Sequence, residues 1–359
     1  MALLQSLQVV FAMGLVMRVL PRGIAGGKVP AVIVFGDSTA DTGNNNFIQT
    51  LFRGNYPPYG RDYTGGIATG RFSNGRLAAD FVSEALGLAP AVPAYLEPGR
   101  SIHRLASGVS FASAGSGLDD VTAQILSFTN HYSSVSLRQQ IQHFKEYKAR
   151  LRHAKGDAAA NHIITRSLYI FSVGASDFLG NYLLYPIRRR RFTLPEYEAF
   201  LVGAAEAAVC DVHGLGARRV RIVGLPPLGC LPLLRTVNHA RPGECSGGHN
   251  VVAVRFNRRL RALVWKLNLE LPGAQVAYVD QYRLLADVID KPWKYGFENS
   301  VRGCCGTGYV ETGVLCSLDN ALTCDNANKY VFFDVIHPSE RAYEMVAKEI
   351  LNGAPHLLK

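Results

Sequence analysis

The sequence predicts a three-layer α/β/α fold built around a five-stranded, mainly parallel sheet. Short apolar, β-branched segments alternate along the chain with longer segments of helical periodicity, and this is the pattern of parallel strands joined by crossover helices. The apolar segments are continuous, as is typical of strands covered on both faces. A composition of 48% hydrophobic and 18% charged residues supplies a full core and excludes a disordered chain.

Ten elements are expected in alternation. Continuous apolar runs predict strands at residues 31–35, 108–112, 168–173, 220–224 and 275–279. Helical periodicity predicts helices at 75–86, 137–152, 194–215, 251–271 and 339 to about 351. Sheets of this kind bind ligands beyond the carboxyl ends of their strands, where the strand order reverses. The functional site is therefore expected at that edge.

The chain is expected to form one domain, residues 26–359. Its 359 residues suit one large α/β domain or two small ones, but no linker or change in composition divides them. No internal repeat is visible, which argues against solenoids and propellers. Beyond the N-terminus no run of 18 apolar residues occurs, so the body of the chain is not expected to span a membrane.

The first residues resemble a secretory signal peptide. Residues 1–17 are apolar and uncharged, and Arg18 and Arg22 precede the small residues Gly23–Gly27. This pattern predicts a signal peptide at 1–25, cleaved near 25–27. The lack of a positive charge before the apolar stretch departs from the usual pattern, and a buried N-terminal helix is the alternative. The prediction is a secreted protein of the extracellular space or cell wall.

Cysteine placement agrees with export. Six of the 7 cysteines lie beyond residue 229: Cys230, Cys245, Cys304, Cys305, Cys316 and Cys324. No C-x-x-C pair or histidine at zinc spacing accompanies them, so no metal site is expected. Short closures would join Cys230 to Cys245 and the vicinal pair to Cys316 and Cys324, in an order that the sequence leaves open. Cys210, in an apolar helical stretch, is expected to be a buried free thiol.

A candidate nucleophile follows the first strand. The predicted strand Ala31–Phe35 is followed directly by Gly36, Asp37 and Ser38. This places the Ser38 hydroxyl at the carboxyl edge of the sheet. If a helix follows, backbone N–H groups after Ser38 point toward whatever lies there and can bind an oxyanion. A serine at this position is also an ordinary cap of a helix N-terminus.

A candidate base lies near the other end of the chain. Asp334 and His337 precede Pro338 and the helix-starting Ser339. In a loop, this spacing lets the carboxylate reach imidazole Nδ1 and leaves Nε2 free to take a serine proton. The G-x-S-x-G elbow of α/β-hydrolases and the glycine-rich nucleotide-binding motifs are absent from the sequence. No cofactor is expected.

These residues belong to a series of blocks that resembles the plant GDSL esterase/lipase family of the SGNH hydrolase superfamily, which has a flavodoxin-like fold. The blocks are Phe35–Ser38 with Asp41 and Gly43–Asn45, Gly70–Arg76, Ser110–Gly117, Pro226–Cys230, Cys304–Gly308, and Asp334 with His337-Pro338. The resemblance implies a secreted serine ester hydrolase with Ser38 as nucleophile, His337 as general base and acid, and Asp334 orienting His337. It assigns the oxyanion hole to the backbone N–H groups of Ser38 and Gly115, with Gly117 as the alternative to Gly115, and to a side chain of a further block.

That further block departs from the family. The family pattern is Gly-x-Asn-Asp, whereas this chain has Gly174-Ala175-Ser176-Asp177. Ser176 can donate a hydrogen bond from a shorter side chain, and loss of one oxyanion donor costs about 10²–10³ in turnover. Reduced activity is expected. The alternative hypothesis is a catalytically weak cell-wall carbohydrate-binding protein that uses the same cleft.

The resemblance suggests acyl lipids, small acyl esters or acetylated polysaccharides as substrates, with specificity in the loops 55–66 and 182–191. Basic clusters at Arg188–Arg191 and at Arg255, Arg258, Arg259 and Arg261 contribute to a net charge of +10. They are either solvated faces or a surface that attracts an acidic wall polymer or an anionic membrane. Nucleic acid is not an expected partner, because no recognition motif accompanies them.

Overall fold

A computed structural model describes residues 29–125, 133–239, 241, 243–318 and 322–352. The predicted signal peptide, residues 1–25, and the two predicted limits of the domain lie outside these ranges. Within them, no helix is both long enough and apolar enough to cross a membrane.

Five parallel strands form the main sheet, as predicted. They are β1 (Val32–Gly36), β2 (Gly108–Ser110), β3 (Leu168–Ser172), β4 (Arg219–Val223) and β5 (Gln275–Val279). Their order across the sheet is β2-β1-β3-β4-β5, and each neighbouring pair is parallel. The strand order therefore reverses between β1 and β3, and a ligand site is expected beyond the carboxyl ends of these two strands.

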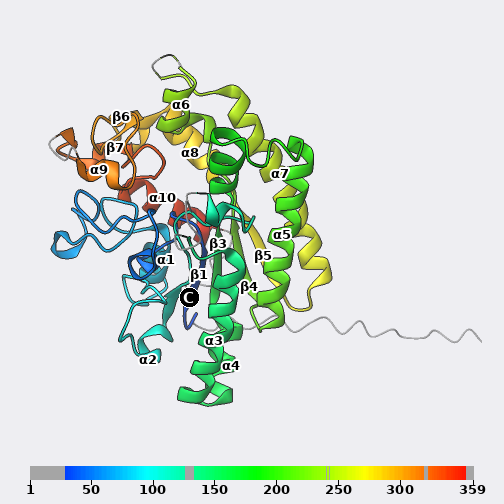
Figure 1. Ribbon diagram of the computed structural model, residues 1–359. Coiled ribbons are helices and arrows are strands. Elements are labelled where there is room, and N and C mark those ends of the chain that lie inside the picture. The colour runs from blue at the N-terminus through cyan, green and yellow to red at the C-terminus, as the bar shows by residue number, and fades with distance from the viewer. Residues whose placement is uncertain (1–28, 126–132, 240, 242, 319–321, 353–359) are drawn as a thin grey trace, which may run out of the picture.

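Helices cover both faces of this sheet (Figure 1). Helices α1 (Ala78–Ala85), α8 (Gln281–Asp290) and α10 (Glu340–Leu351) lie on one face. Helices α3 (Leu137–Lys155), α5 (Leu194–Gly214) and α7 (Gly247–Glu270) lie on the other. Further α-helices in the described ranges are α2 (Ile102–Leu105), α4 (Asp157–Arg166), α6 (Pro232–Val237) and α9 (Val314–Leu318). The three-layer architecture predicted from the sequence is confirmed.

The five predicted helices are present, with shifted ends. Helix α7 begins four residues before the predicted start, and α3 runs three residues past its predicted end before Gly156 stops it. Gly156 has a φ of 79°, which a residue with a side chain adopts only with strain. Helix α8 is amphipathic but was not predicted, because its 10 residues directly follow a strand and give a short pattern.

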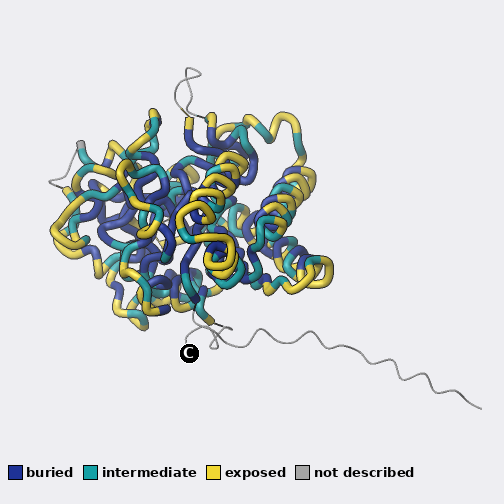
Figure 2. Tube along the Cα trace, turned by 90° about the horizontal axis from the view of Figure 1, so that it is seen from below, coloured by how far each residue is buried: buried dark blue, intermediate teal, exposed yellow. Residues whose placement is uncertain are grey.

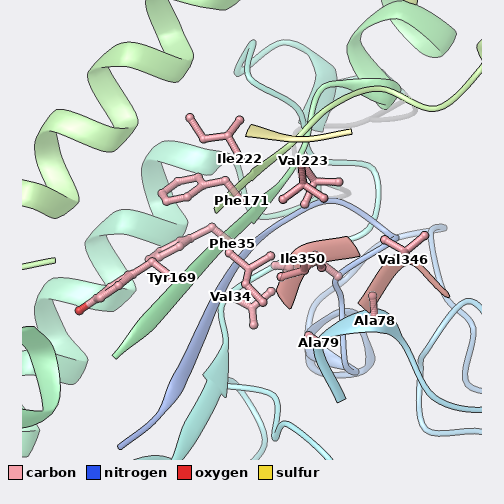
Figure 3. Close-up of a cluster of buried hydrophobic side chains, with 14 of the residues drawn as sticks. Val34, Phe35, Ala78, Ala79, Tyr169, Phe171, Ile222, Val223, Val346 and Ile350 are labelled. Atoms are coloured by element: carbon pink, nitrogen blue, oxygen red, sulfur yellow. The ribbon is translucent and has the colours of Figure 1, made fainter. Parts of the chain in front are cut away.

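Side chains of the central strands alternate between two apolar layers. Val34 faces Ala79 of α1 and Ile350 of α10, whereas Phe35 and Phe171 lie on the opposite face (Figure 3). The rings of Phe35 and Phe171 stack with centroids 4.9 Å apart, an arrangement that adds to the energy of burial. Figure 2 shows the buried residues gathered inside the molecule and the exposed ones on helix faces and loops. A core on both sides keeps the carboxyl edge of the sheet in a fixed position.

A second, two-stranded parallel sheet carries the cysteine-rich segment. It pairs β6 (Asn299–Gly303) with β7 (Tyr330–Phe332). Disulfides join Cys304 to Cys324 and Cys305 to Cys316, and a third joins Cys230 to Cys245. The pairing of the vicinal cysteines, which the sequence left open, is thereby settled.

Cys210 is a free cysteine on α5, but the prediction that it is buried was wrong, because the residue is partly exposed. The buried face of α5 includes Val209 and Val212, and position 210 lies beside that face rather than on it. Burial of part of the side chain still raises the pKa of the Cys210 thiol, with nearby carboxylates adding to the effect.

Candidate active site

The end of β1 presents Ser38 at the carboxyl edge of the sheet. Gly36 lies so close to β3 that an added Cβ would be 2.1 Å from the carbonyl oxygen of Ser172, so only glycine fits there. Asp37 and Ser38 then leave the sheet in a turn, in which the Asp37 carbonyl accepts from the N–H of Asp41 at 3.0 Å. No α-helix begins at Ser38 in the described chain. Ser38 is therefore not a helix cap, and its hydroxyl is available for another contact.

The loop between β7 and α10 brings His337 to Ser38. Ser339 caps α10, where its hydroxyl accepts from the N–H of Ala342. The preceding loop folds so that His337 Nε2 lies 2.7 Å from Ser38 Oγ, across 299 positions of sequence. His337 Nδ1 lies 2.7 Å from Asp334 Oδ2. With a carboxylate at Nδ1, the ring proton resides on Nδ1, and Nε2 accepts from the serine hydroxyl.

Asp334 is fully buried and densely hydrogen-bonded. Its Oδ1 accepts from the backbone N–H groups of Ile336 and His337 at 2.8 and 2.7 Å. Burial alone would raise the pKa of Asp334. The charge of His337 and hydrogen bonds from His337, Tyr59 and Ile336 outweigh it, and the pKa of Asp334 is lowered below its ordinary value. The carboxylate is therefore ionised and able to stabilise an imidazolium.

Ser38 and His337 line a cavity of about 390 Å³. Gly115 and Ser176, two of the predicted oxyanion donors, line the same cavity. The rest of the wall is mainly apolar and is formed by Leu51, Phe52, Phe72, Ala114, Thr122, Ile125, Leu179, Gly180, Leu184, Tyr185, Thr312, Gly313, Val314, Leu315 and Ile336. The structure thus brings Ser38, His337, Gly115 and Ser176 to one cavity, and Asp334 lies behind it in contact with His337.

The two glycines left open as oxyanion donors have different surroundings. Gly115 has a φ of 82° and borders the cavity, and a Cβ there would meet the ring of Phe52 at 2.5 Å. Gly117 does not line the cavity, and a Cβ there would lie 2.2 Å from Asp177 Oδ1. Of the two, Gly115 is the one that lines the same cavity as Ser38.

Polar side chains after Ser38 fix the segment that carries Gly115. Asn44 donates to the carbonyl oxygens of Ser110 and Ala112, at 2.9 and 2.8 Å. Asp41 accepts from the N–H of Ala114 at 3.0 Å, and burial raises the pKa of Asp41 to about 6. These contacts tie the turn after β1 to the segment that follows β2. The first sequence block therefore supports the cavity as well as supplying Ser38.

Ser176 lies after β3, at the start of a π-helix (Asp177–Leu184). Ser176 lines the cavity, and no hydrogen bond to its hydroxyl is found in the described part of the chain. Asp177 accepts from the backbone N–H groups of Leu118 and Asp119 and from the Thr122 hydroxyl. Mainly through burial, the pKa of Asp177 is raised to about 7. Asp177 is thus a support of the neighbouring loop, and Ser176 is free to donate.

Ser176→Asn is expected to raise turnover of a p-nitrophenyl acyl ester. A full oxyanion donor contributes about 10²–10³ in rate, and the role predicted for Ser176 would give its shorter side chain only part of this, so an increase of about 10- to 100-fold is expected. Steady-state kinetics measure it, with active-site titration by a fluorophosphonate as the control for the amount of active protein. An unchanged or lower kcat would show that the site is adapted to serine.

Two hydroxyls that sequence reasoning missed contact Asp334. The Tyr59 hydroxyl donates to Asp334 Oδ2 at 2.6 Å, and the Thr312 hydroxyl donates to the same oxygen at 2.9 Å. Tyr59 lies in the loop 55–66 that was expected to set specificity, yet no residue of that loop lines the cavity. The other expected loop, 182–191, contributes Leu184 and Tyr185. No local pattern marks Tyr59 or Thr312, because each acts across a long sequence separation.

Four of the eight arginines in the two predicted basic clusters form ion pairs. Arg188 binds the buried Asp119 through two nitrogens. Arg255 and Arg259 both bind Glu198, which is fully buried, and Arg261 pairs with Asp280. The remaining arginines are exposed: Arg189, Arg190, Arg191 and Arg258. Binding of an acidic partner remains a prediction, and these four exposed arginines are the residues to which it now applies.

Comparisons with known proteins match almost the entire chain. A family model described as GDSL-like lipase/acylhydrolase matches residues 32–350. GDSL esterase/lipase At2g42990 of Arabidopsis thaliana is 50% identical over 334 residues, which cover 93% of this chain and 94% of that protein. GDSL esterase/lipase At4g26790 of the same plant is 48% identical over 324 residues, or 90% and 91% of the two chains. Among solved structures, an acetylxylan esterase from Geobacillus stearothermophilus aligns over 90% of this chain and 95% of its own, with 15% identity and a TM-score of 0.37.

Proposed function

The chain belongs to the GDSL-like lipase/acylhydrolase family and is an ester-bond hydrolase, and we propose that it acts through an acyl-enzyme on Ser38. The observation that carries this proposal is the continuous series of contacts from Ser38 Oγ to His337 Nε2 and from His337 Nδ1 to Asp334 Oδ2, each 2.7 Å long. This is the arrangement that activates a serine hydroxyl.

In the first half-reaction, Ser38 Oγ attacks the ester carbonyl while its proton passes to His337 Nε2. The developing oxyanion is stabilised by the N–H groups of Ser38 and Gly115 and by the Ser176 hydroxyl. Asp334 stabilises the imidazolium and holds its ring. His337 then gives the proton to the leaving alkoxide, the C–O bond of the ester breaks, and the acyl group remains on Ser38.

In the second half-reaction, water replaces the alcohol. His337 takes a proton from the water as it attacks the acyl carbonyl, and the same oxyanion donors stabilise the second tetrahedral intermediate. Collapse returns the proton from Nε2 to Ser38 Oγ and releases the carboxylic acid. The net reaction converts one ester and one water into one alcohol and one carboxylic acid.

We further propose that the preferred acyl group is a hydrocarbon chain longer than acetyl. The cavity beside Ser38 is walled by apolar side chains such as Leu179, Leu184 and Ile336, and its 390 Å³ falls in the usual range of small-molecule sites, about 300–1,000 Å³. Each buried methylene contributes about 0.8 kcal/mol, or about fourfold in kcat/KM. An acetyl group would leave most of this apolar wall uncovered.

A chain-length series tests both proposals. With p-nitrophenyl esters from acetate to octanoate, kcat/KM is expected to rise with each added methylene until the cavity is full, by about fourfold per step. Leu184→Asn places a polar group in the wall and should flatten this rise while sparing acetate. Leu183→Asn is the matched control, because Leu183 is also partly buried in the π-helix but does not line the cavity. A maximum at acetate would refute the acyl-chain proposal, and inertness toward every ester would refute the acyl-enzyme proposal.

We also propose that the mature protein is one secreted domain, residues 26–359. Three disulfides within the described chain are typical of oxidising compartments, and the N-terminal sequence pattern supports export. The N-terminal sequence of the exported protein tests this, and a start far from residues 25–27 would contradict it.

A further inference from the structure

A buried tyrosine contacts the carboxylate that orients the base. Tyr59 is 1% exposed, and its hydroxyl donates to Asp334 Oδ2 at 2.6 Å. The backbone N–H of Gly313 donates to the same tyrosine oxygen at 2.8 Å. Because an N–H can only donate, the tyrosine oxygen accepts from Gly313, and its own proton is directed to Asp334.

Asp334 Oδ2 is shared among three side chains. It accepts from His337 Nδ1, from Tyr59 and from Thr312, at 2.7, 2.6 and 2.9 Å. A fully buried carboxylate has no water to stabilise its charge, so these donors replace water. The two hydroxyls also fix where Oδ2 lies, and Oδ2 is the atom that holds the imidazole of His337.

The ring of Tyr59 is locked by aromatic neighbours that also reach His337. Its centroid lies 5.5 Å from that of Phe72 and 5.4 Å from that of Phe333. Phe72 in turn packs on the ring of His337, with centroids 4.8 Å apart. The hydroxyl is therefore held by packing as well as by hydrogen bonds, which is the kind of support that preorganises a catalytic group.

We propose that Tyr59 is a positioning residue of the hydrolytic site, whose hydroxyl, together with that of Thr312, holds Asp334 Oδ2 in line with His337 Nδ1. The inference rests on the proposed acyl-enzyme chemistry. It gives Tyr59 a role in the orientation and charge of Asp334 beyond its contribution to the apolar core.

Other titratable groups near the triad also act on its charges. Asp37, Tyr56 and Tyr343 interact electrostatically with Asp334 or His337. The pKa of Tyr59 is well above its ordinary value, through burial first and the charge of Asp334 second. Tyr59 consequently stays protonated at any working pH and always donates.

Tyr59→Phe removes the hydroxyl and keeps the ring. The variant is expected to lose about 10- to 100-fold in kcat, the usual effect of a hydrogen bond to a charged group, with little change in KM. The acid limb of its kcat/KM profile should move to higher pH, because a carboxylate with fewer donors attracts the imidazole proton more strongly. Thr312→Val should act in the same direction, and Thr312→Ser should restore the parent profile.

Tyr56→Phe is the matched control, since the Tyr56 hydroxyl donates to the carbonyl oxygen of Arg53 instead of to Asp334. A second measurement does not depend on turnover: the low-field NMR resonance of the His337 Nδ1 proton, whose titration midpoint should rise in Tyr59→Phe. Parent kinetics and an unmoved midpoint in Tyr59→Phe would overturn the inference, and so would lost activity with an unmoved acid limb and an unmoved midpoint. Failure of the acyl-enzyme proposal would show separately, as a parent protein that takes up no fluorophosphonate while the midpoint still shifts.

Discussion

Ser38→Ala is expected to abolish ester hydrolysis, lowering kcat by about 10⁶, the typical effect of removing a nucleophilic serine from a triad. In the proposed mechanism, Ser38 Oγ is the atom that bonds to the acyl carbon. In the structure, this oxygen contacts His337 Nε2. Initial rates with p-nitrophenyl butyrate measure the loss. Folding should be unaffected, because Ser38 is only partly buried and its side chain bonds to no backbone group of the described residues. An unchanged urea midpoint is the control.

Covalent labelling sharpens this test. A fluorophosphonate should modify the parent protein at Ser38 and leave Ser38→Ala unlabelled. Turnover by Ser38→Ala within about 100-fold of the parent would contradict the mechanism and point to another nucleophile. Ser176 lines the same cavity, so the double variant Ser38→Ala/Ser176→Ala decides whether its hydroxyl is responsible. A parent that is never labelled would instead revive the hypothesis of a wall carbohydrate-binding protein.

Much of the main fold was predictable because central strands that are buried on both faces read as largely apolar runs, although β4 also contains the buried Arg219 and Arg221. Strands β1 and β3, which flank the site, are of this kind. The small sheet was not predicted, because Tyr330–Phe332 has three residues and Asn299–Gly303 is partly exposed. Such short, mixed segments carry no clear periodicity.

The site residues that belong to local sequence motifs were predictable, and the others were not. Ser38 and the pair Asp334 and His337 lie at element ends, where neighbouring residues indicate a turn or a loop. Tyr59 has no such context, since its contact with Asp334 spans 275 positions and a tyrosine in a loop has many ordinary explanations. The ion pair of Arg255 with Glu198 spans 57 positions and could not be predicted for the same reason. From the sequence alone, a cluster of arginines is therefore expected to be more exposed to solvent than the structure shows.

Arg71→Met is expected to destabilise the protein by about 3–5 kcal/mol, because it leaves Asp80 buried without its partner. Arg71 binds both oxygens of Asp80 at 2.8 Å, and the two side chains are 4% and 0% exposed. Urea unfolding monitored by circular dichroism, with the disulfides intact, measures the change. Arg76→Met is the matched control, since Arg76 pairs with Glu84 and Glu340 near the surface, where an ion pair contributes about 0–1 kcal/mol.

The double variant Arg71→Met/Asp80→Leu separates the two causes of the loss. Removing both charges leaves no unpaired carboxylate, so much of the stability should return. Activity should stay reduced, because Arg71 also donates to the carbonyl oxygen of Thr42 and its neighbour Phe72 packs on His337. If Arg71→Met alone is as stable as the parent, the backbone N–H groups that also bind Asp80, from Leu77 and Val92, are sufficient to hold its charge, and the guanidinium serves the active site more than the fold.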